Sequence, residues 1–543
     1  MPRTRPGLPL VCAATAGFVA AALLTVGPPG IDTPAHLFMT WVFRHAGFQL
    51  WNNYWYDGRY DFVGYSVLFY PLAAVVGVWA AAVASSAVLA YAVAAVGRRE
   101  WGQAANAPCL MLAVTATATC CISGVFPFLA GAAAGAVALA CAQRRQRIGF
   151  GAATLVSLGC SPLAFGLLAV VLAGFVVGGR HPLGVARRNK AAVAALVATA
   201  AACVILQRAF PSGGRYPYHL SDLLVVALFS GAGLYLTAAS PRARGLQMVF
   251  AAYLLLNLAT FAVPGPVGSN TTRLFTIAGV PLLWLAANVS PRRSWLTLAP
   301  VLALALALQL GPAVRTAYSA WSDQATAASF WRPAVRFLKA RPNIQYRTEV
   351  VATEGHWEAF YMAARGIALA RGWFRQDDFP QNQVLYQPTL SADQYQAWLR
   401  SVGVRYVMLP HAPLDYSAIT EAHLLRSGRS GLRLVRHLPG WTVYELAHPT
   451  PILTSAGAPG AASVLALTDS RIRLWLPAAG AYDLRVRYSP YWSTDTSGVC
   501  LSPTTTGMTH IATPTPGPLT IEFEPTLATV AAAAASDSSH CSS

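Results

Sequence analysis

The stretch that decides the fold is LPLVCAATAGFVAAALLTVGP, residues 8–28, which carries no charge and is followed at once by PGIDTPAH, residues 29–36. A helix needs about 20 apolar residues to cross roughly 30 Å of hydrocarbon, so this stretch predicts a membrane span. The stretch does not show the small-residue cleavage pattern of a signal peptide, and Arg3 and Arg5 precede it. We therefore expect a retained anchor with a cytoplasmic N-terminus, which places Asp32 on the extracytoplasmic side.

The composition extends this interpretation to a large part of the 543-residue chain. Hydrophobic residues make up 55% of it and charged residues 11%, with a mean hydropathy of +0.44. A soluble globule could not bury so much apolar surface, so an integral membrane protein is expected. The net charge of +18 would suggest nucleic acid in a soluble protein, but here the arginines form short clusters between apolar runs. That pattern orients membrane helices and indicates membrane lipids, not nucleic acid, as partners.

The apolar runs predict about eleven membrane helices. Basic clusters fall at every second connection between these runs, which satisfies the positive-inside rule for a multi-pass protein of the cytoplasmic membrane. The break GCSP, residues 159–162, divides a stretch that is too long for one helix and short for two, so we expect two short or re-entrant helices there. The expected spans are 8–28, 72–97, 106–123, 125–142, 148–160, 161–179, 190–208, 221–239, 246–263, 274–289 and 295–313.

The distribution of acidic residues predicts a soluble domain outside the cytoplasm. The first 313 residues hold only Asp32, Asp57, Asp61, Glu100 and Asp222, whereas 16 of the 21 acids come later. Mixed helical and strand patterns predict an α/β domain over 314–448, and the alternating, turn-rich pattern of 449–530 predicts a small β-sandwich. Residues 531–543 are of low complexity and are expected to be disordered. The transmembrane domain would then be 1–313.

The cysteines do not have the spacing of a metal site, and no metal ligands are assigned. Seven of them lie in or beside apolar spans, where helix packing explains them. Cys500 and Cys541 belong to the predicted oxidising side and could form a disulfide bond.

Several motifs resemble those of a known superfamily. WNNYWYDGRY (residues 51–60), YSVLFYPL (65–72) and GSNTTRL (268–274) look like a family of actinobacterial membrane proteins near the GT-C glycosyltransferases. A cytoplasmic N-terminus, an acid in the first external loop, about eleven helices and a C-terminal external domain also resemble that superfamily. GT-C members often show paired acids in the first loop, where this chain has Asp32 and a nearby histidine.

The resemblance implies an enzyme that takes a sugar, of arabinose or mannose type, from a polyprenyl monophosphate. The acceptor would be a cell-envelope glycan or glycolipid. The donor lipid then stands in place of a cofactor, and the need for a divalent metal is left open. The fold expected is a polytopic α-helical GT-C-like domain followed by the α/β domain and the β-sandwich.

Sugar transfer from a lipid phosphate needs a base for the acceptor hydroxyl and cations for the departing phosphate. Asp32 is the candidate base, although Asp before Thr-Pro is also a strong helix N-cap, and the two roles are compatible. His36 lies four residues later, where it could orient Asp32, contact substrate or simply pack. Arg273 is the candidate for the phosphate, with Asn270 beside it in the same motif; Arg273 could alternatively reach lipid headgroups.

The remaining candidates are substrate-binding residues. Asp57, Arg59 and Asp61 lie among aromatic residues that could form a sugar-facing wall. Alternatively, the aromatic residues form a belt at the headgroups and Asp57 pairs with Arg59 at the surface. His356 and Glu358, in EGHWE (354–358), follow a predicted strand and could face the active site, although packing is an equally simple explanation.

Two other classes of function are open. A transporter would place charges inside its helices and often show repeated halves, whereas the spans here are nearly free of charge. A non-catalytic scaffold for envelope assembly would share the same topology. Substitution of Asp32 distinguishes the scaffold from the enzyme, because an enzyme would lose sugar transfer whereas a scaffold would tolerate the change.

Overall fold

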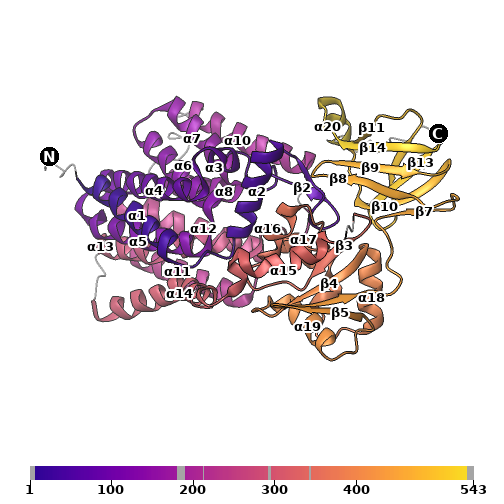
Figure 1. The fold of residues 1–543 in the computed structure, drawn as a ribbon. Coiled ribbons are helices and arrows are strands. Elements are labelled where there is room, and N and C mark those ends of the chain that lie inside the picture. Colours follow the sequence, from indigo (N-terminus) through magenta and orange to yellow (C-terminus); the bar gives the residue numbers. More distant parts are fainter. Residues whose placement is uncertain (1–6, 180–189, 212, 291–294, 342–343, 535–543) are drawn as a thin grey trace. The chain divides into compact units, whose positions relative to one another are not determined.

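The computed structural model describes residues 7–179, 190–211, 213–290, 295–341 and 344–534. These residues form two compact units (Figure 1). The first comprises Met1–His36, Tyr65–Ile205 and Arg215–Ser322, and the second Leu37–Gly64, Leu206–Gly214 and Asp323–Ser543. The first external loop from Leu37 to Gly64 thus belongs to the second unit, together with the C-terminal part of the chain.

The first unit is helical throughout its described residues. Helices α2 and α10 run across the boundary, and the other helices lie within the unit. The helices are α1 (Leu8–Val26), α2 (Thr33–Ala46), α3 (Phe69–Val76), α4 (Val78–Trp101), α5 (Asn106–Ser123), α6 (Phe126–Gln143), α7 (Arg147–Cys160), α8 (Pro162–Gly178), α10 (Lys190–Ala209), α11 (Leu220–Thr237), α12 (Arg244–Ala262), α13 (Arg273–Asn288) and α14 (Trp295–Trp321).

Seven helical stretches of the described chain are long and apolar enough to cross a membrane. One of them, Val78–Ser123, contains both α4 and α5, and α7 and α8 are shorter apolar helices. The predicted multi-pass helical protein is therefore confirmed. The number of crossings and the cytoplasmic N-terminus stay predictions.

The helix boundaries follow the predicted spans closely, with three differences. The span predicted at 72–97 is two helices, because Gly77 adopts φ +90° between α3 and α4. Helix α14 continues to Trp321, beyond the predicted end at 313. The break at 159–162 does separate two short helices, and the Ser161 hydroxyl caps α8 by accepting from the Ala164 N–H at 3.3 Å.

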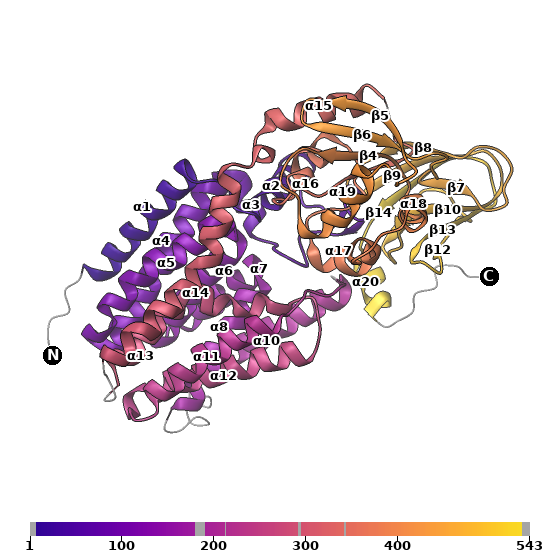
Figure 2. The ribbon, with the colours of Figure 1, turned by 90° about the horizontal axis from the view of Figure 1, so that it is seen from below.

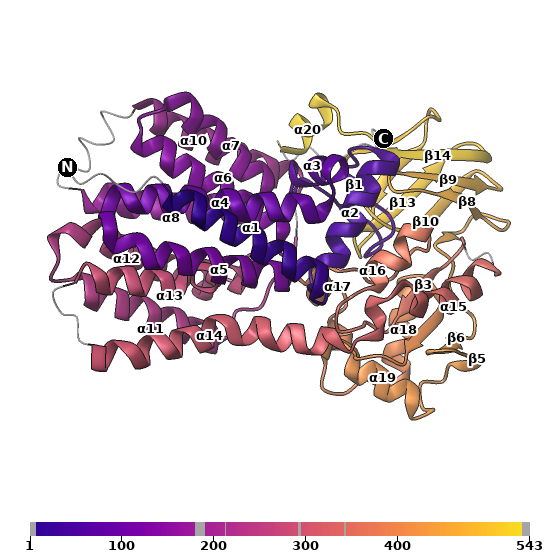
Figure 3. The same ribbon diagram turned by 60° about the vertical axis from the view of Figure 1, so that its left-hand side comes forward.

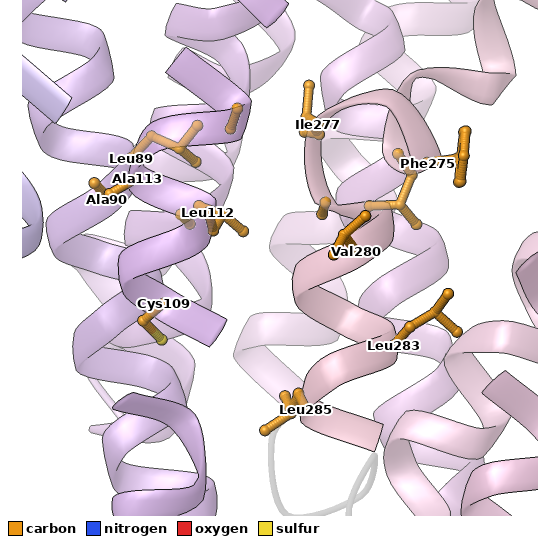
Figure 4. Close-up of a cluster of buried hydrophobic side chains, with 14 of the residues drawn as sticks. Leu89, Ala90, Cys109, Leu112, Ala113, Phe275, Ile277, Val280, Leu283 and Leu285 are labelled. Carbon is orange, nitrogen blue, oxygen red and sulfur yellow. The ribbon is translucent and has the colours of Figure 1, made fainter. Parts of the chain in front are cut away.

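The core of the first unit lies between packed apolar helices. Helix α1 packs on α4 and α5, and α13 packs on α5 and α14, as Figure 2 shows. Figure 4 shows part of this core: Leu89 and Leu112 come from α4 and α5, whereas Ile277 and Leu285 come from α13. Many of the core residues are alanine or glycine, which allows the helix backbones to approach closely.

The second unit contains a mixed sheet of order β3-β4-β6-β5. Strands β3 and β4 are parallel, and β6 pairs antiparallel with both β4 and β5. This confirms the predicted α/β region. Its elements are α15 (Ala328–Lys339), β3 (Arg347–Val350), α16 (Glu358–Tyr361), α17 (Arg375–Gln381), α18 (Ala392–Ser401), β4 (Val404–Pro410), α19 (Ile419–Arg426), β5 (Arg433–Leu438) and β6 (Trp441–Glu445).

The rest of the second unit is the predicted β-sandwich, drawn in yellow tones in Figure 3. Its two antiparallel sheets have the orders β12-β13-β10-β7 and β11-β14-β9-β8. Side chains of β9 alternate between exposed and buried, as a half-buried strand requires. The strands are β7 (Leu453–Ser455), β8 (Ser463–Leu467), β9 (Arg471–Leu476), β10 (Gly480–Arg487), β11 (Trp492–Thr494), β12 (Cys500–Pro503), β13 (Met508–Thr513) and β14 (Gly517–Phe523).

The first loop is built into the core of the second unit. It forms the short hairpin of β1 (Trp51–Asn52) and β2 (Arg59–Tyr60), and the Trp51 ring packs 5.2 Å from Phe523 and 5.1 Å from Trp492 of the sandwich. Trp51 and Trp55 are at most 2% exposed. The alternative in which these aromatic residues form a headgroup belt is therefore wrong.

The C-terminal end differs in part from expectation. Leu527–Ala534 form helix α20, so the first residues of the predicted disordered tail are helical. Cys500 is disulfide-bonded. Its expected partner Cys541 and the rest of the tail lie outside the described residues.

Candidate functional site

Asp32 sits in a turn that two glycines hold against the end of α5. The Asp32 N–H donates to the Ser123 carbonyl at 3.1 Å. A Cβ on Gly30 would lie 2.4 Å from the Gly124 nitrogen, and one on Gly124, which has φ +80°, would lie 2.9 Å from the Thr33 hydroxyl. Only glycines allow this approach, so the backbone of Asp32 is fixed to the turn between α5 and α6.

Asp32 also stands at the start of α2. The helix begins at Thr33, and the His36 N–H donates to the Asp32 carbonyl at 3.4 Å. Asp32 therefore occupies the N-cap position that the sequence predicted. Its carboxylate also lies close to another predicted site residue. Asp32 can therefore have a second role besides that of an N-cap.

That residue is Arg273, the first residue of α13. Its Nη2 lies 3.9 Å from the Asp32 Oδ2, and the two side chains are 20% and 13% exposed. Nη2 also donates to the Asn270 Oδ1 at 3.1 Å, and the guanidinium lies 5.2 Å from the centre of the Phe128 ring. The structure thus brings Asp32 close to Arg273 and Asn270, which lie more than 230 residues later in the sequence.

Figure 1 shows α13 within the helical unit. The backbone at its start is already bonded: the Arg273 N–H donates to the Asn270 carbonyl, and the Phe275 N–H donates to the Tyr253 hydroxyl at 3.3 Å. The anion-binding group at this position is therefore the side chain of Arg273. A guanidinium has five N–H donors in a planar fork, so Arg273 can bind a phosphate and keep its bond to Asn270.

His36 is fully buried beside this site. Its Nδ1 lies 3.2 Å from the Tyr70 hydroxyl, and its ring packs 5.9 Å from Phe126 and 5.7 Å from Tyr65. Burial, and to a smaller degree the charge of Arg273, lowers the pKa of His36 to about 3, so the imidazole is neutral. A side chain with 0% exposure packs the wall of the site, which favours the packing interpretation over direct substrate contact.

Sequence reasoning did not single out Tyr65. Burial is the main cause that raises the pKa of Tyr65. The charge of Asp32 raises it further and the charge of Arg273 lowers it, so the Tyr65 hydroxyl is close to both site residues. Tyr65 begins the motif YSVLFYPL, which resembles a motif of membrane proteins near the GT-C superfamily. This resemblance was the signal in the sequence that could have identified Tyr65. Nothing in the sequence indicated that Gly30 and Gly124 meet.

An apolar cavity of about 1220 Å³ lies within the helical unit. Phe128, which faces Arg273, and Leu274, the next residue after it, both line the cavity. Along α13 the lining continues to Leu285, a length of roughly 16 Å at 1.5 Å per residue. The other walls come from α4, α5, α6, α8 and α12, and the described lining carries no charged side chain.

The predicted first-loop residues form buried ion pairs within the second unit. Arg59 donates from Nε to Asp377 at 2.8 Å and from Nη1 to Asp61 at 2.6 Å, and it stacks 3.6 Å above Phe374. The Asp57 Oδ1 lies 3.3 Å from the Arg347 Nη1. The idea that Asp57 pairs with Arg59 at the surface is therefore wrong, since both are buried and have other partners. Their proposed contact with substrate stays a prediction.

His356 and Glu358 also belong to a buried network of the second unit. The His356 Nδ1 lies 3.1 Å from Glu358 and its Nε2 lies 3.5 Å from Asp415, which Arg375 also binds at 2.7 Å. Burial alone would lower the pKa of His356, but the hydrogen bonds and charges of Asp415 and Glu358 raise it to about 9. The imidazole thus lies between two carboxylates, and the Arg375 Nη2 is 3.3 Å from its Nε2.

Within the described ranges, no group of three or more His, Cys, Asp or Glu side chains is arranged to hold a metal ion. The site brings together a carboxylate, a guanidinium, an amide and an apolar cavity. These groups suit a ligand that combines an anion with a long apolar substituent.

No family model matches the chain, and no curated protein matches it. Among solved structures, the chain is similar to the arabinofuranosyltransferase AftD from Mycobacteria, with a TM-score of 0.48 and 15% identity over 87% of this chain and 41% of that one. A mutant of AftD gives a TM-score of 0.49 and 16% identity, with coverage of 83% and 42%. The oligosaccharyltransferase of Archaeoglobus fulgidus gives 0.38 and 11%, with coverage of 75% and 69%. The chain thus spans less than half the length of AftD, and the proteins that it resembles are, by their names, transferases of sugars.

Proposed function

We propose that the protein is a membrane glycosyltransferase of the GT-C kind. It would move a sugar, of arabinose or mannose type, from a polyprenyl monophosphate to a glycan or glycolipid of the cell envelope. The observation that carries the proposal is the pair of Asp32 and Arg273 beside the apolar cavity of about 1220 Å³.

Each part of the donor has a matching part in the site. The isoprenoid chain would lie along the apolar lining from Leu274 to Leu285. The phosphate would bind the guanidinium of Arg273. The sugar would then project toward Asp32.

In the reaction, Asp32 would take the proton of the acceptor hydroxyl. The hydroxyl oxygen attacks the anomeric carbon, and the bond from that carbon to the phosphate oxygen breaks. The polyprenyl phosphate leaves with the electron pair of this bond, and Arg273 stabilises the charge that develops on it. Inversion at the anomeric carbon is implied by the resemblance to GT-C enzymes.

Replacement of Asp32 tests the proposal. In full-length protein in lipid nanodiscs, supplied with decaprenyl-phosphoryl arabinose or mannose, Asp32→Asn should lower transfer by roughly 10²- to 10⁴-fold, the usual contribution of a general base. Asp222→Asn is the matched control, because Asp222 is a partly exposed acid of the same unit, in the first turn of α11. Thermal unfolding of both variants should resemble that of the unmodified protein.

Full transfer by Asp32→Asn would remove Asp32 from the mechanism. If the unmodified protein neither binds nor uses any polyprenyl-phosphate sugar, the proposal fails and a scaffold becomes the better interpretation.

A further inference from the structure

A second cavity lies wholly within the second unit. Its empty volume, which includes space open to solvent, is about 820 Å³. The walls come from the end of α15, the segment that leads into β3, the residues after Ala363–Arg365, and the end of β8. The lining residues are Leu338, Lys339, Ile344, Tyr346, Thr348, Arg365, Gly366, Ile367, Ala368 and Leu467.

The charged residues in this lining are both cationic. Lys339 ends α15 and Arg365 precedes Gly366, so the two charges come from separate segments. Both side chains are exposed, and the described lining contains no carboxylate. The Arg365 Nη1 donates to the Tyr361 carbonyl at 3.1 Å, which holds the guanidinium in place and leaves further N–H donors for a ligand. The cavity therefore favours an anion.

Apart from the buried Thr348, the remaining lining is apolar or aromatic. Ile344 is 41% exposed and Ile367 is half-buried, so both offer apolar surface to a ligand. The Tyr346 ring is close to Arg405, whose Cζ lies 5.8 Å from its centre. Gly366 leaves open space, because a Cβ there would meet nothing within 4 Å. A pyranose ring, with its apolar C–H face and polar edge, suits such a surface.

The first loop borders this cavity. The Tyr54 hydroxyl donates to the Leu467 carbonyl at 3.3 Å, and the Leu369 N–H, next to Ala368, donates to the Tyr54 carbonyl at 2.9 Å. The walls are thus held by the aromatic motif of residues 51–60 as well as by β3 of the mixed sheet and β8 of the sandwich. This arrangement fixes the shape of the cavity before any ligand binds.

We propose that this cavity binds an anionic saccharide, in which carboxylate or phosphate groups pair with Lys339 and Arg365. If the saccharide is the acceptor glycan of the transfer reaction, the inference rests on the proposed function. The binding itself does not depend on transfer.

The test is calorimetric binding to the full-length protein in neutral nanodiscs. The probes are tetragalacturonate and maltotetraose, which have the same number of rings and the same type of linkage but differ in charge. We expect tetragalacturonate to bind at least roughly tenfold more tightly, and the difference to shrink in high salt because salt screens the charges. Lys339→Gln and Arg365→Gln should each weaken tetragalacturonate binding by roughly fivefold to tenfold.

Arg336→Gln is the matched control, since Arg336 is an exposed cation on the same helix outside the cavity. It should bind tetragalacturonate like the unmodified protein. Equal affinity for the two tetrasaccharides, or equal loss in the Arg336 control, would overturn the proposal. So would inorganic phosphate that binds as tightly as tetragalacturonate, because the site would then recognise an anion without a saccharide.

The same measurement on Asp32→Asn separates this inference from the proposed function. Unchanged binding of tetragalacturonate in that variant supports the cavity as a site of its own, even if no sugar transfer is detected with the unmodified protein. Loss of binding in Asp32→Asn would contradict the inference.

Discussion

His356 shows how a single residue can be misjudged from sequence. It lies in EGHWE, a motif that looks catalytic, yet it is buried between Glu358 and Asp415 and has φ +50°, a conformation that few non-glycine residues adopt. Its Nδ1 lies 3.1 Å from Glu358, and its Nε2 lies 3.5 Å from Asp415 and 3.3 Å from the Arg375 Nη2. Its position therefore indicates a contribution to the stability of the second unit.

This contribution should depend on pH. The pKa of His356 is raised from 6.5 to about 9 in the folded protein, so the stabilisation is complete below about pH 6.5 and is lost as pH rises through 9. It amounts to roughly 3 kcal/mol, because one pKa unit corresponds to about 1.4 kcal/mol. We expect the unfolding temperature of the second unit to fall between pH 6.5 and 9, and His356→Gln to lower it at pH 6.5 and flatten this dependence.

His411→Gln is the control for this measurement, because the His411 Nε2 lies 2.9 Å from a neutral group, the Thr442 hydroxyl. Its unfolding temperature should keep the pH dependence of the unmodified protein. An unchanged slope in His356→Gln would show that other groups cause it.

At the candidate site, sequence reasoning found the residues with unusual chemistry and missed those that position them. Asp32 was conspicuous because acids are scarce in the first 313 residues, and Arg273 because it opens a helix after an external loop. The contact between Gly30 and Gly124 could not be predicted, since glycine has many uses and the two residues are far apart in the chain. The partners of Arg59 and Asp57 were missed for the same reason.

Among the elements, α13 connects the site to the cavity. The sequence predicted a span at 274–289, and the helix runs from Arg273 to Asn288 because the apolar run itself marks the membrane segment. It continues through Pro281, and the side chain of Gln309 on α14 accepts the Val280 N–H at 2.9 Å. This bond joins the two helices where proline interrupts the regular pattern.

Filling the cavity from α13 should impair use of long donors. Ala278 is buried and lines the cavity, so Ala278→Phe would occupy space that the isoprenoid chain needs. We expect the KM for a decaprenyl-phosphate sugar to rise by roughly tenfold, the effect of losing about two buried methylene groups. The KM for the short citronellyl-phosphate sugar should change little. Ala80→Phe, at an exposed position of α4 outside the cavity, is the control; equal effects of both variants on the two donors would contradict the assignment of the cavity.

At the scale of the molecule, the largest departure from the sequence prediction is that the two units are not continuous in the chain. The sequence suggested one transmembrane domain over 1–313, because hydropathy is read along the chain. The structure assigns residues 37–64 and 206–214 to the second unit instead. Their partners, such as Phe523 for Trp51, lie hundreds of residues away, and local patterns carry no information about such pairs.

The second unit should therefore depend on the first loop. Trp51 is 2% exposed in the core of the sandwich, and Trp51→Ala should destabilise this unit by roughly 3–5 kcal/mol through loss of burial and formation of a cavity. Limited proteolysis of the full-length protein should then cut within residues 450–523 at lower protease concentrations. Trp475→Ala, at a 43% exposed position of the same sandwich, is the control and should leave the digestion pattern unchanged.

The split second unit also sets an order of events during biosynthesis. Residues 37–64 emerge from the ribosome about 260 residues before Asp323, the first residue of the C-terminal segment of the unit. At about 5–20 residues per second, this interval is on the order of ten to fifty seconds. During that time the rings of Trp51, Trp55 and Tyr56 have none of their C-terminal partners. The newly synthesised loop therefore stays accessible to chaperones and proteases until the C-terminal segment has been translated.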